Sequence, residues 1–568
     1  MKEIIKEKIT LALARLIEEE RIEDVDIPQF TIERTRDSKH GDLACNIALI
    51  LAKKIKIRPL DLAKLICNEI TNDLCIKKTE IAGPGFINFF LSQNTQTEIV
   101  NTILSKADNF GSNESGNNEC GEKQKIQVEF VSANPTGPLH IGHGRGAVIG
   151  DCICRLLERS GWDVTREFYY NDEGKQIDNL ARSVQLRCNG ISPEHDEWLK
   201  DGYCGEYIID LAKDFISGKT VNGITASAVI EDIESIRKFA VSYLRREQDH
   251  DLKAFNINFD VFSLESDLYK EGKVENTISS LINNGFTFEK DNALWLKTTA
   301  FGDDKDRVMR KSDGKYTYFV PDIAYHVDKW NRGYKKVINE QGADHHSTIT
   351  RVRAGLQALN LDIPVNWPDY VLHQMVTVLK DKEEVKISKR SGSYVTLNDI
   401  ITQVGSDAAR YFLIARRPES QLTFDIDLAL QKNNENPVYY IQYAHARLCS
   451  VLEQASAKQT PLDIENGKNN LTRLTNESEL SILKSLEAYP DLILKSARDY
   501  APHNIASYLK DLASDIHSWY AVGSKYKAQQ VLVDEKNIRD ARLCLVEATR
   551  QVISNGLTIL GISAPRKM

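Results

Sequence analysis

Several features that define common protein classes are missing from this sequence of 568 residues. No apolar run approaches the roughly eighteen residues of a membrane-spanning helix, so we expect no membrane partner. The N-terminal residues alternate charged and apolar side chains and lack the apolar block of a secretory signal. No internal repeat is visible. These absences leave a cytoplasmic globular protein as the expectation.

Paired cysteines are also missing, because the ten cysteines are scattered and form no Cys-x-x-Cys motif. Cys152 and Cys154 are close in sequence but would point in different directions from a predicted helix. This usage is typical of reduced, mostly buried thiols in a cytosolic enzyme. We therefore expect no protein-bound metal.

The composition that is present describes an ordinary globular chain, with 42% hydrophobic and 27% charged residues. Its length exceeds what one hydrophobic core supports, so several domains are expected. The net charge of −8 argues only weakly against a nucleic-acid partner. One face can be basic while the rest of the surface is acidic.

Periodicity divides the chain into four parts. The predicted fold is α/β, with a Rossmann-type parallel-sheet catalytic core between a small α/β N-terminal domain and an all-helical C-terminal bundle. The parts are an N-terminal domain at 1–110, a polar Gly-rich linker at 111–122, a catalytic domain at 123–405 with a mostly helical insertion at about 171–290, and a helical domain at 406–568. Within them, we expect a helix at about 42–54 and resumption of the catalytic fold near Ala293–Leu296.

The most informative stretch runs from Glu129 to His143. A short apolar strand enters a turn rich in proline and glycine, and His140 and His143 follow where helical spacing begins. A second predicted strand at 163–169 completes a β-α-β unit, which places the turn at the carboxyl end of a parallel sheet. Helix N-termini there attract phosphates. A His-x-Gly-His tetrapeptide also arises by chance as a cap, but this context favours a nucleotide site.

A second motif gathers cations around Ser388, namely Lys386, Lys389 and Arg390. Alone, such a cluster is typical of a solvated surface loop. Together with the histidine turn it predicts a loop that brings ammonium groups to an ATP phosphate chain. Charge that develops on the phosphates in the transition state would be stabilised by these cations.

The two motifs in this order resemble those of class I aminoacyl-tRNA synthetases: His140-Ile-Gly-His143 is similar to the first and Lys386–Arg390 to the second. Other stretches resemble arginyl-tRNA synthetases in particular. These stretches are Val128–Pro138, Tyr316–His326, Gly342–His346, Asp407–Arg410, Asn436–Arg447 and Gly561–Met568. The resemblance thus extends over nearly the whole chain.

This resemblance implies an activity. L-Arginine and ATP would form arginyl-adenylate and pyrophosphate, and arginine would pass to the 3′ end of tRNA(Arg) for protein synthesis. ATP would enter with Mg²⁺ held mainly by phosphates and water, and tRNA is usually required even for the first step. The implied catalytic residues are His140, His143, Lys386 and Lys389, and ATP binding would also use Gly142 and Ser388.

A guanidinium ligand favours carboxylates and an aromatic face. By resemblance, Glu129, Tyr318 and Asp322 would hold the guanidinium group. Three further residues would hold the α-amino and carboxylate end of arginine, namely Ser132, Asn134 and Asp344. From the residues alone, the favoured interpretation of Tyr318 and Asp322 is a helix start packed into the core, with Asp322 as its cap.

One departure from the family bears on the second motif. Some arginyl enzymes lack its lysine and carry a lysine shortly before the first histidine instead. Here the upstream position is Gly137 and Lys389 is present, so we assign phosphate stabilisation to Lys389. Ile387 replaces a common methionine with a side chain of similar size.

On the tRNA side, Tyr440, Tyr443 and Arg447 share one helix face, where aromatic rings and a guanidinium plane would stack on anticodon bases. Core packing of these tyrosines is the competing interpretation. The N-terminal domain resembles the family's extra domain, which contacts the tRNA elbow, and its basic loop Arg34–His40 is a candidate for phosphate contacts.

Two other functions remain open at this point. One is a different ligase with the same phosphate turn, such as a glutamyl- or cysteinyl-type synthetase, although a zinc-ligand set for the latter is missing. The other is a non-catalytic RNA-binding relative, against which the intact histidines and lysines argue. We expect this protein to be a monomer.

Overall fold

The computed structural model describes residues 2–35, 37–70, 75–385 and 395–568. Contacts divide the chain into two compact units, each with its own hydrophobic core. One unit comprises residues 1–107, 451–488 and 515–551, and the other comprises residues 108–450, 489–514 and 552–568.

The larger unit is built on a five-stranded parallel sheet in the order β14-β13-β5-β6-β9. Its strands are β5 (Lys125–Glu129), β6 (Asp163–Tyr170), β9 (Val261–Leu264), β13 (Lys336–Gly342) and β14 (Asp369–His373). The chain starts in the middle at β5, adds β6 and β9 on one side, and then returns to the other side for β13 and β14. The strand order therefore reverses between β5 and β13, which is where open α/β sheets bind ligands.

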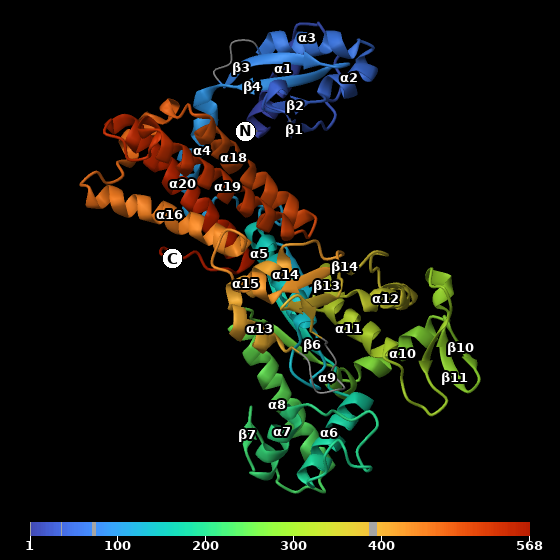
Figure 1. Ribbon diagram of the computed structural model, residues 1–568. Helices are drawn as coiled ribbons and strands as arrows, with labels where there is room; N and C mark the ends of the chain where they lie inside the picture. The colour runs from blue at the N-terminus through green and yellow to red at the C-terminus, as the bar shows by residue number, and fades with distance from the viewer. Residues whose placement is uncertain (1, 36, 71–74, 386–394) are drawn as a thin grey trace. The chain divides into compact units, whose positions relative to one another are not determined.

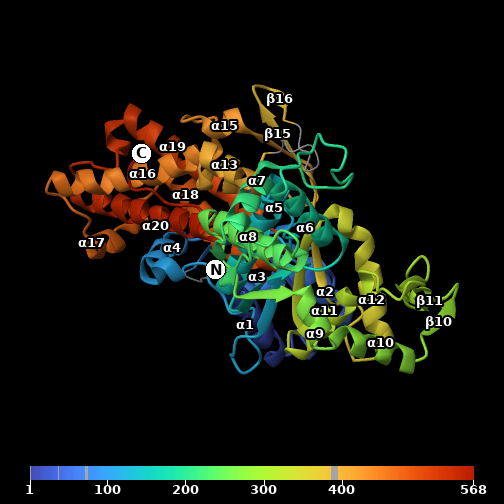
Figure 2. The same ribbon diagram turned by 90° about the horizontal axis from the view of Figure 1, so that it is seen from below.

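Helix α5 (Ile141–Arg159) connects β5 to β6 and is almost wholly buried. It approaches β5 closely because of Gly150: a Cβ atom there would overlap the ring of Phe130. Helices α11 (Phe319–Asn331) and α12 (His346–Ala358) pack with α10 (Lys273–Asn283) and share one apolar core (Figures 1 and 2).

The stretch predicted as an insertion contains a small helical group with its own core (Figure 1). Its elements are α6 (Lys175–Cys188), α7 (Glu206–Ile216), β7 (Thr220–Val221), β8 (Ile224–Thr225) and α8 (Ile233–Ala254). Beyond α8, but still before residue 290, β9 pairs with β6 in the central sheet and is followed by α9 (Glu265–Lys270).

The segment near Ala293–Leu296 forms β11, which pairs with β10 (Thr287–Lys290) and β12 (Arg307–Arg310) in a separate antiparallel sheet. The central sheet continues only at β13. The reason is local turn chemistry: Asp291 and Asn292 both adopt positive φ, at 54° and 58°, and such a pair closes a two-residue hairpin.

In this unit, the central sheet is followed along the chain by α13 (Leu397–Val404), α14 (Ser406–Ile414), α15 (Ile426–Leu430) and the start of α16 (Pro437–Ala457). Strand β15 (Val376–Lys380) pairs in parallel with β17 (Leu422–Asp425) and antiparallel with β16 (Glu383–Glu384). The C-terminal part of the chain is helical, as expected, and contains α18 (Glu477–Arg498), α19 (His503–Lys525) and α20 (Lys536–Leu560), with a short α17 (Ile464–Asn469) before them.

The other unit includes an antiparallel sheet in the order β1-β2-β4-β3. Its elements up to residue 107 are α1 (Lys2–Glu18), β1 (Ile32–Arg34), β2 (Leu43–Cys45), α2 (Ile47–Ile55), α3 (Pro59–Ile70), β3 (Ile76–Ala82), β4 (Phe86–Leu91) and α4 (Gln93–Lys106). The helix expected at 42–54 is wrong at its start. Residues 43–45 pair with β4 instead, Leu43 opposite Phe89, so long-range strand pairing overrides local helical periodicity.

Within the described ranges, no helix combines the length and the apolar character that crossing a bilayer requires.

Candidate active site

The predicted phosphate turn begins at the carboxyl end of β5. Val131 and Ser132 follow with φ of 68° and 37°, so two successive non-glycine residues occupy the left-handed region. The Ser132 hydroxyl donates to Glu129 Oε1 at 2.8 Å and accepts from the backbone N–H of Tyr169 at 3.2 Å. Backbone strain of this kind concentrates at functional sites and persists only where surrounding bonds enforce it.

His140 and His143 are held at the N-terminus of α5 by reciprocal hydrogen bonds. The amide of His143 donates to His140 Nδ1 at 3.3 Å, and the amide of His140 donates to His143 Nδ1 at 3.2 Å. Their half-buried rings stack with centroids 3.6 Å apart. Gly142 leaves room for this stack, because a Cβ there would lie 3.0 Å from His140 Cε1. Two imidazoles thus stand at a helix end that attracts anions.

The second motif, with Lys386, Ser388 and Lys389, lies outside the described residues. The chain that follows it does meet the histidine turn. Thr396 forms a β-bridge with His140, and the amide of Leu397 donates to the carbonyl of Leu139 at 2.8 Å. Leu397 also contacts the start of α5, where a Cβ on Gly144 would lie 2.8 Å from its side chain.

The residues predicted to hold guanidinium lie on β5 and α11. Asp322 is in the first turn of α11, and Tyr318 precedes that helix with 58% of its surface exposed. Exposure of Tyr318 excludes the core-packing alternative for this ring, and Asp322 does not cap the helix. Burial, and then the charge of Glu129, raise the pKa of Asp322 to about 7.

Two other predicted arginine ligands, Asn134 and Asp344, form no hydrogen bond or ion pair with Glu129 or Asp322 among the described residues. Asn134 donates from Nδ2 to Gln176 Oε1 on α6 at 2.8 Å. Asp344 is exposed, and its carboxylate lies 3.6 Å from His345 Nε2. The structure therefore brings Ser132 to Glu129 directly, whereas the Asp344 side chain points to solvent beside its neighbour.

Sequence reasoning missed two buried charges of this region. Glu265, the first residue of α9, accepts from the Tyr169 hydroxyl at 3.1 Å. Burial raises its pKa to about 7, and the nearby charges of Asp322 and Asp172 add to the shift. Lys329 of α11 binds Glu129 Oε2 at 2.5 Å. A signal existed for Lys329 alone: it lies seven positions after Asp322, on the same helical face.

The carboxylates of Glu129, Asp322 and Glu265 thus lie close enough to influence one another, on the strand β5 that leads into the histidine turn and at the starts of α11 and α9. Carboxyl groups that raise one another's pKa favour a bound cation, because a cation relieves their repulsion. Among the described residues, no group of three or more His, Cys, Asp or Glu side chains is arranged to hold a metal ion.

The predicted tRNA-binding residues lie on the half-buried side of α16. Arg447 donates from Nη2 to the Tyr443 hydroxyl at 2.9 Å, and its guanidinium lies 4.6 Å from the centroid of that ring. Tyr440 is likewise half-buried. The core side of this helix is formed by other residues, among them Val438, Ile441 and Leu448.

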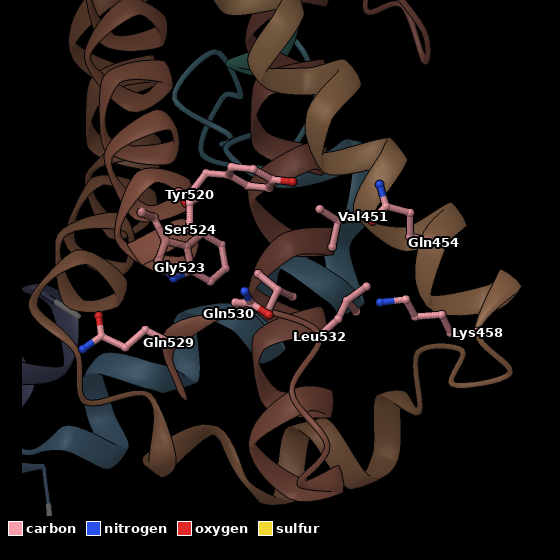
Figure 3. Close-up of a pocket in the computed structure, with 11 residues that line it drawn as sticks. Val451, Gln454, Lys458, Tyr520, Gly523, Ser524, Gln529, Gln530 and Leu532 are labelled. Carbon is pink, nitrogen blue, oxygen red and sulfur yellow. The ribbon is translucent and has the colours of Figure 1, made fainter. Parts of the chain in front are cut away.

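A cavity of about 200 Å³ lies within the other unit (Figure 3). The end of α16, the second half of α19 and the segment before α20 line it, with Gln454, Lys458, Tyr520 and Gln530 among the lining residues. The indole N–H of Trp519 is buried there and has no hydrogen-bond partner among the described residues. The cavity belongs to a different unit from the histidine turn, so we assign it no part in the chemistry.

Parallel sheet, strand-order reversal and paired histidines at a helix start together define a class I aminoacyl-tRNA synthetase, and comparison with known families agrees. Residues 105–444 match the family described as "tRNA synthetases class I (R), catalytic domain", and residues 3–91 match "Arginyl tRNA synthetase N terminal domain". Residues 441–568 match "DALR anticodon binding domain". The chain belongs to the arginyl-tRNA synthetase family.

Individual relatives support this assignment over the full length. The chain is 52% identical to the arginine–tRNA ligase of Geotalea uraniireducens (strain Rf4) over 574 residues, covering 100% of both chains. It is 52% identical over 575 residues to that of Geobacter metallireducens, again covering 100% of both. Its fold is similar to that of Thermus thermophilus arginyl-tRNA synthetase, with a TM-score of 0.74, 20% identity and 100% of both chains covered. The glutamyl- and cysteinyl-type alternatives are thereby set aside.

Proposed function

We propose that this enzyme is an arginine–tRNA ligase whose reaction takes place at the carboxyl ends of β5 and β13. In the first step, the α-carboxylate of L-arginine attacks the α-phosphate of ATP, and pyrophosphate leaves with its bonding electrons. In the second step, a hydroxyl of the 3′-terminal adenosine of tRNA(Arg) attacks the carbonyl carbon of the adenylate and releases AMP. Neither step needs a protein nucleophile, so positioning and charge stabilisation supply the acceleration.

The ATP phosphates bind at the N-terminus of α5 in this proposal. His140 and His143 donate to them from their ring nitrogens, and Gly142 lets the phosphate chain approach the backbone. What supports this role is the paired capping arrangement at the helix start. Lys386, Ser388 and Lys389 of the second motif complete the phosphate site, with Lys389 stabilising the departing pyrophosphate. Mg²⁺ accompanies ATP and is held mainly by phosphates and water.

The side chains around Glu129 and Asp322 bind the amino acid, and they form the proposed arginine pocket. Asp322 pairs with the guanidinium group, with Tyr318 as the aromatic face and Glu129 beneath, while Ser132, Asn134 and Asp344 serve the α-amino and carboxylate end. The observation that carries this assignment is the Asp322 carboxylate. It is partly buried, its pKa is raised to about 7, and no described side chain donates to it. A partly buried carboxylate to which no side chain donates lacks a cationic partner, and the substrate guanidinium provides one.

The tRNA binds along the remaining domains. Tyr440, Tyr443 and Arg447 meet the anticodon loop, and the N-terminal domain meets the elbow. The functional division into 1–110, 111–122, 123–405 and 406–568 belongs to this proposal, as do a monomeric state and a cytoplasmic location.

The direct test is aminoacylation of a tRNA(Arg) transcript, measured separately with each proteinogenic amino acid. Arginine alone should be attached. Attachment of any other amino acid at a comparable kcat/KM contradicts the proposal. Arginine-dependent exchange of pyrophosphate into ATP should be slight until tRNA(Arg) is added, and strong exchange without tRNA contradicts the expected tRNA requirement.

A further inference from the structure

A lysine ammonium group lies buried beneath the proposed arginine pocket. The Lys329 side chain is 0% exposed, and its Nζ donates to Glu129 Oε2 at 2.5 Å and to Asn339 Oδ1 at 2.9 Å. The same ammonium lies 4.4 Å from the centroid of the Tyr325 ring. Glu129 and Asn339 are register partners on β5 and β13. Lys329 therefore ties the end of β5 to the middle of β13, the two strands between which the strand order reverses.

The contact between Lys329 and Glu129 makes the two carboxylates that were assigned to guanidinium differ in their pairing. Both oxygens of Glu129 already accept hydrogen bonds, one from Lys329 and the other from Ser132. Asp322 lies about two helical turns before Lys329 on α11. Among the described residues, the Asp322 carboxylate has no such partner. One carboxylate is thus neutralised by the protein, whereas the other is left for a ligand.

We propose that Lys329 is a positioning residue for arginine: by neutralising Glu129, it leaves Asp322 as the carboxylate that pairs with the substrate guanidinium. This inference rests on the proposed arginine pocket and extends it. A buried pair of this kind costs desolvation free energy that an apolar pair of similar size avoids. Its charges are therefore expected to serve binding as well as folding.

The charges around Asp322 explain why the ammonium matters. The negative charges near Asp322 are those of Glu129 on β5 and Glu265 on α9, and the positive charge is that of Lys329 on α11. The hydroxyls of Tyr169 on β6 and Tyr370 on β14 complete its surroundings. Burial and the Glu129 charge raise the pKa of Asp322, and the Lys329 charge lowers it. Without the ammonium, Asp322 would remain protonated to a higher pH. A protonated carboxyl group forms no ion pair with guanidinium.

The test is calorimetric titration of the full-length enzyme with L-arginine from about pH 6 to about pH 8.5, where Asp322 ionises but the guanidinium does not. For the wild type, arginine affinity should rise with pH and level off above about pH 7, the pKa of Asp322. Lys329→Met should bind arginine at least about tenfold more weakly at pH 7, with the midpoint of the pH dependence moved up by about one unit or more. Lys329→Arg retains the charge and should keep the wild-type midpoint.

A second variant removes both charges at once. Glu129→Gln/Lys329→Met has no charge on either partner, so it should recover affinity to within about threefold of the wild type at pH 7. Asp322→Asn should bind arginine more weakly than the wild type at every pH above about 7. If Lys329→Met does not fold, the double variant alone tests the proposal. The proposal requires the double variant to bind arginine with a pH dependence that follows the ionisation of Asp322.

Two results would overturn the proposal. In the first, Lys329→Met binds arginine as the wild type does; in the second, it loses the same factor at every pH with an unchanged midpoint, which is what a purely structural role predicts. The proposed function fails separately, if the wild type attaches no arginine to tRNA(Arg). A wild type that charges tRNA, together with a Lys329→Met variant of unshifted midpoint, refutes only the role of Lys329.

Discussion

The backbone amide of Leu397 donates a hydrogen bond of 2.8 Å to the carbonyl of Leu139. Leu139 directly precedes the first histidine of the first motif, and Leu397 follows the second motif by seven positions. Thr396 reinforces the link through its bridge to His140 and caps α13 with its side chain. Residues 396 and 397 are thereby fastened to the histidine turn.

Replacing His140 tests the phosphate turn. Asparagine is a good helix N-cap, so His140→Asn should keep α5 intact while removing the imidazole. We expect kcat for aminoacylation to fall about 10²- to 10³-fold, the usual loss for one donor to a developing anion, with an unchanged thermal midpoint. His195→Ala, an exposed histidine of the helical insertion, is the control and should leave kcat unaltered. Undiminished kcat in His140→Asn would place the phosphates elsewhere.

Lys389 is expected to act on the transition state rather than on binding. Lys389→Ala should therefore lower kcat by about 10²-fold or more, with KM for arginine changed by less than about threefold. Lys382→Ala, an exposed lysine just before the motif, should behave as the wild type. Steady-state aminoacylation kinetics distinguish these outcomes. A rise in KM alone would assign Lys389 to substrate binding instead.

The Arg447 guanidinium lies 4.6 Å from the Tyr443 ring centroid on α16, and both groups are of the kind on which bases stack. Arg447→Ala should raise KM for tRNA(Arg) about tenfold or more, and leave the calorimetric affinity for arginine unchanged, because stacking contributes about 1–3 kcal/mol per base. Arg416→Ala, an exposed arginine of the same unit, is the matched control. Equal KM values for tRNA in both variants would remove Arg447 from the anticodon interface.

Glu167 of β6 predicts a pH dependence of stability. It accepts from Ser263, Tyr325 and Arg332, at 2.7, 2.8 and 2.8 Å. Burial alone would raise its pKa, but the Arg332 hydrogen bond, the charges of Lys329 and Arg332 and the Ser263 hydrogen bond together outweigh burial and lower the pKa from 4.5 to about 2. A lowered folded-state pKa contributes stability above the unfolded value, and this stability is lost as pH falls towards 2.

The Glu167→Gln variant should therefore melt well below the wild type at pH 7, and the gap in thermal midpoint should narrow between about pH 5 and about pH 3. Glu435→Gln, at an exposed site, should show no gap at either pH. A difference in thermal midpoint that is constant from about pH 7 to about pH 3 would mean that the Glu167 charge does not contribute to stability.

Arg410 should be required for stability. It is fully buried, donates from Nε to the carbonyl of Leu560 at 2.8 Å and from Nη1 to that of Phe255 at 2.9 Å, and pairs with Asp151. Arg410→Met leaves Asp151 as a buried charge with less compensation, which typically costs about 3–5 kcal/mol. Calorimetry should show a clearly lower unfolding midpoint, whereas Arg416→Met should be neutral. Equal midpoints would contradict this role.

Local patterns allowed much of this molecule to be predicted. The apolar strand, the turn and the helical spacing after His143 are consecutive in sequence, so the β-α-β unit and its histidines followed without tertiary information. Where a long-range partner decided the outcome, prediction failed: residues 43–45 form β2 because they pair with β4. The segment of β11 was misassigned for a local reason, since a two-residue turn pairs it with β10 and not with the central sheet.

By itself, the sequence determined the family, the parallel-sheet core and the histidines at the start of a helix after its first strand, because these depend on neighbouring residues and on their order. Only the tertiary structure decided which carboxylates are paired with protein side chains. Lys329 and Glu129 are 200 positions apart, and Glu265 and Tyr169 are 96 apart. Pairing, burial and the resulting pKa shifts arise only when the strands and helices that carry these side chains pack together, which no local pattern records.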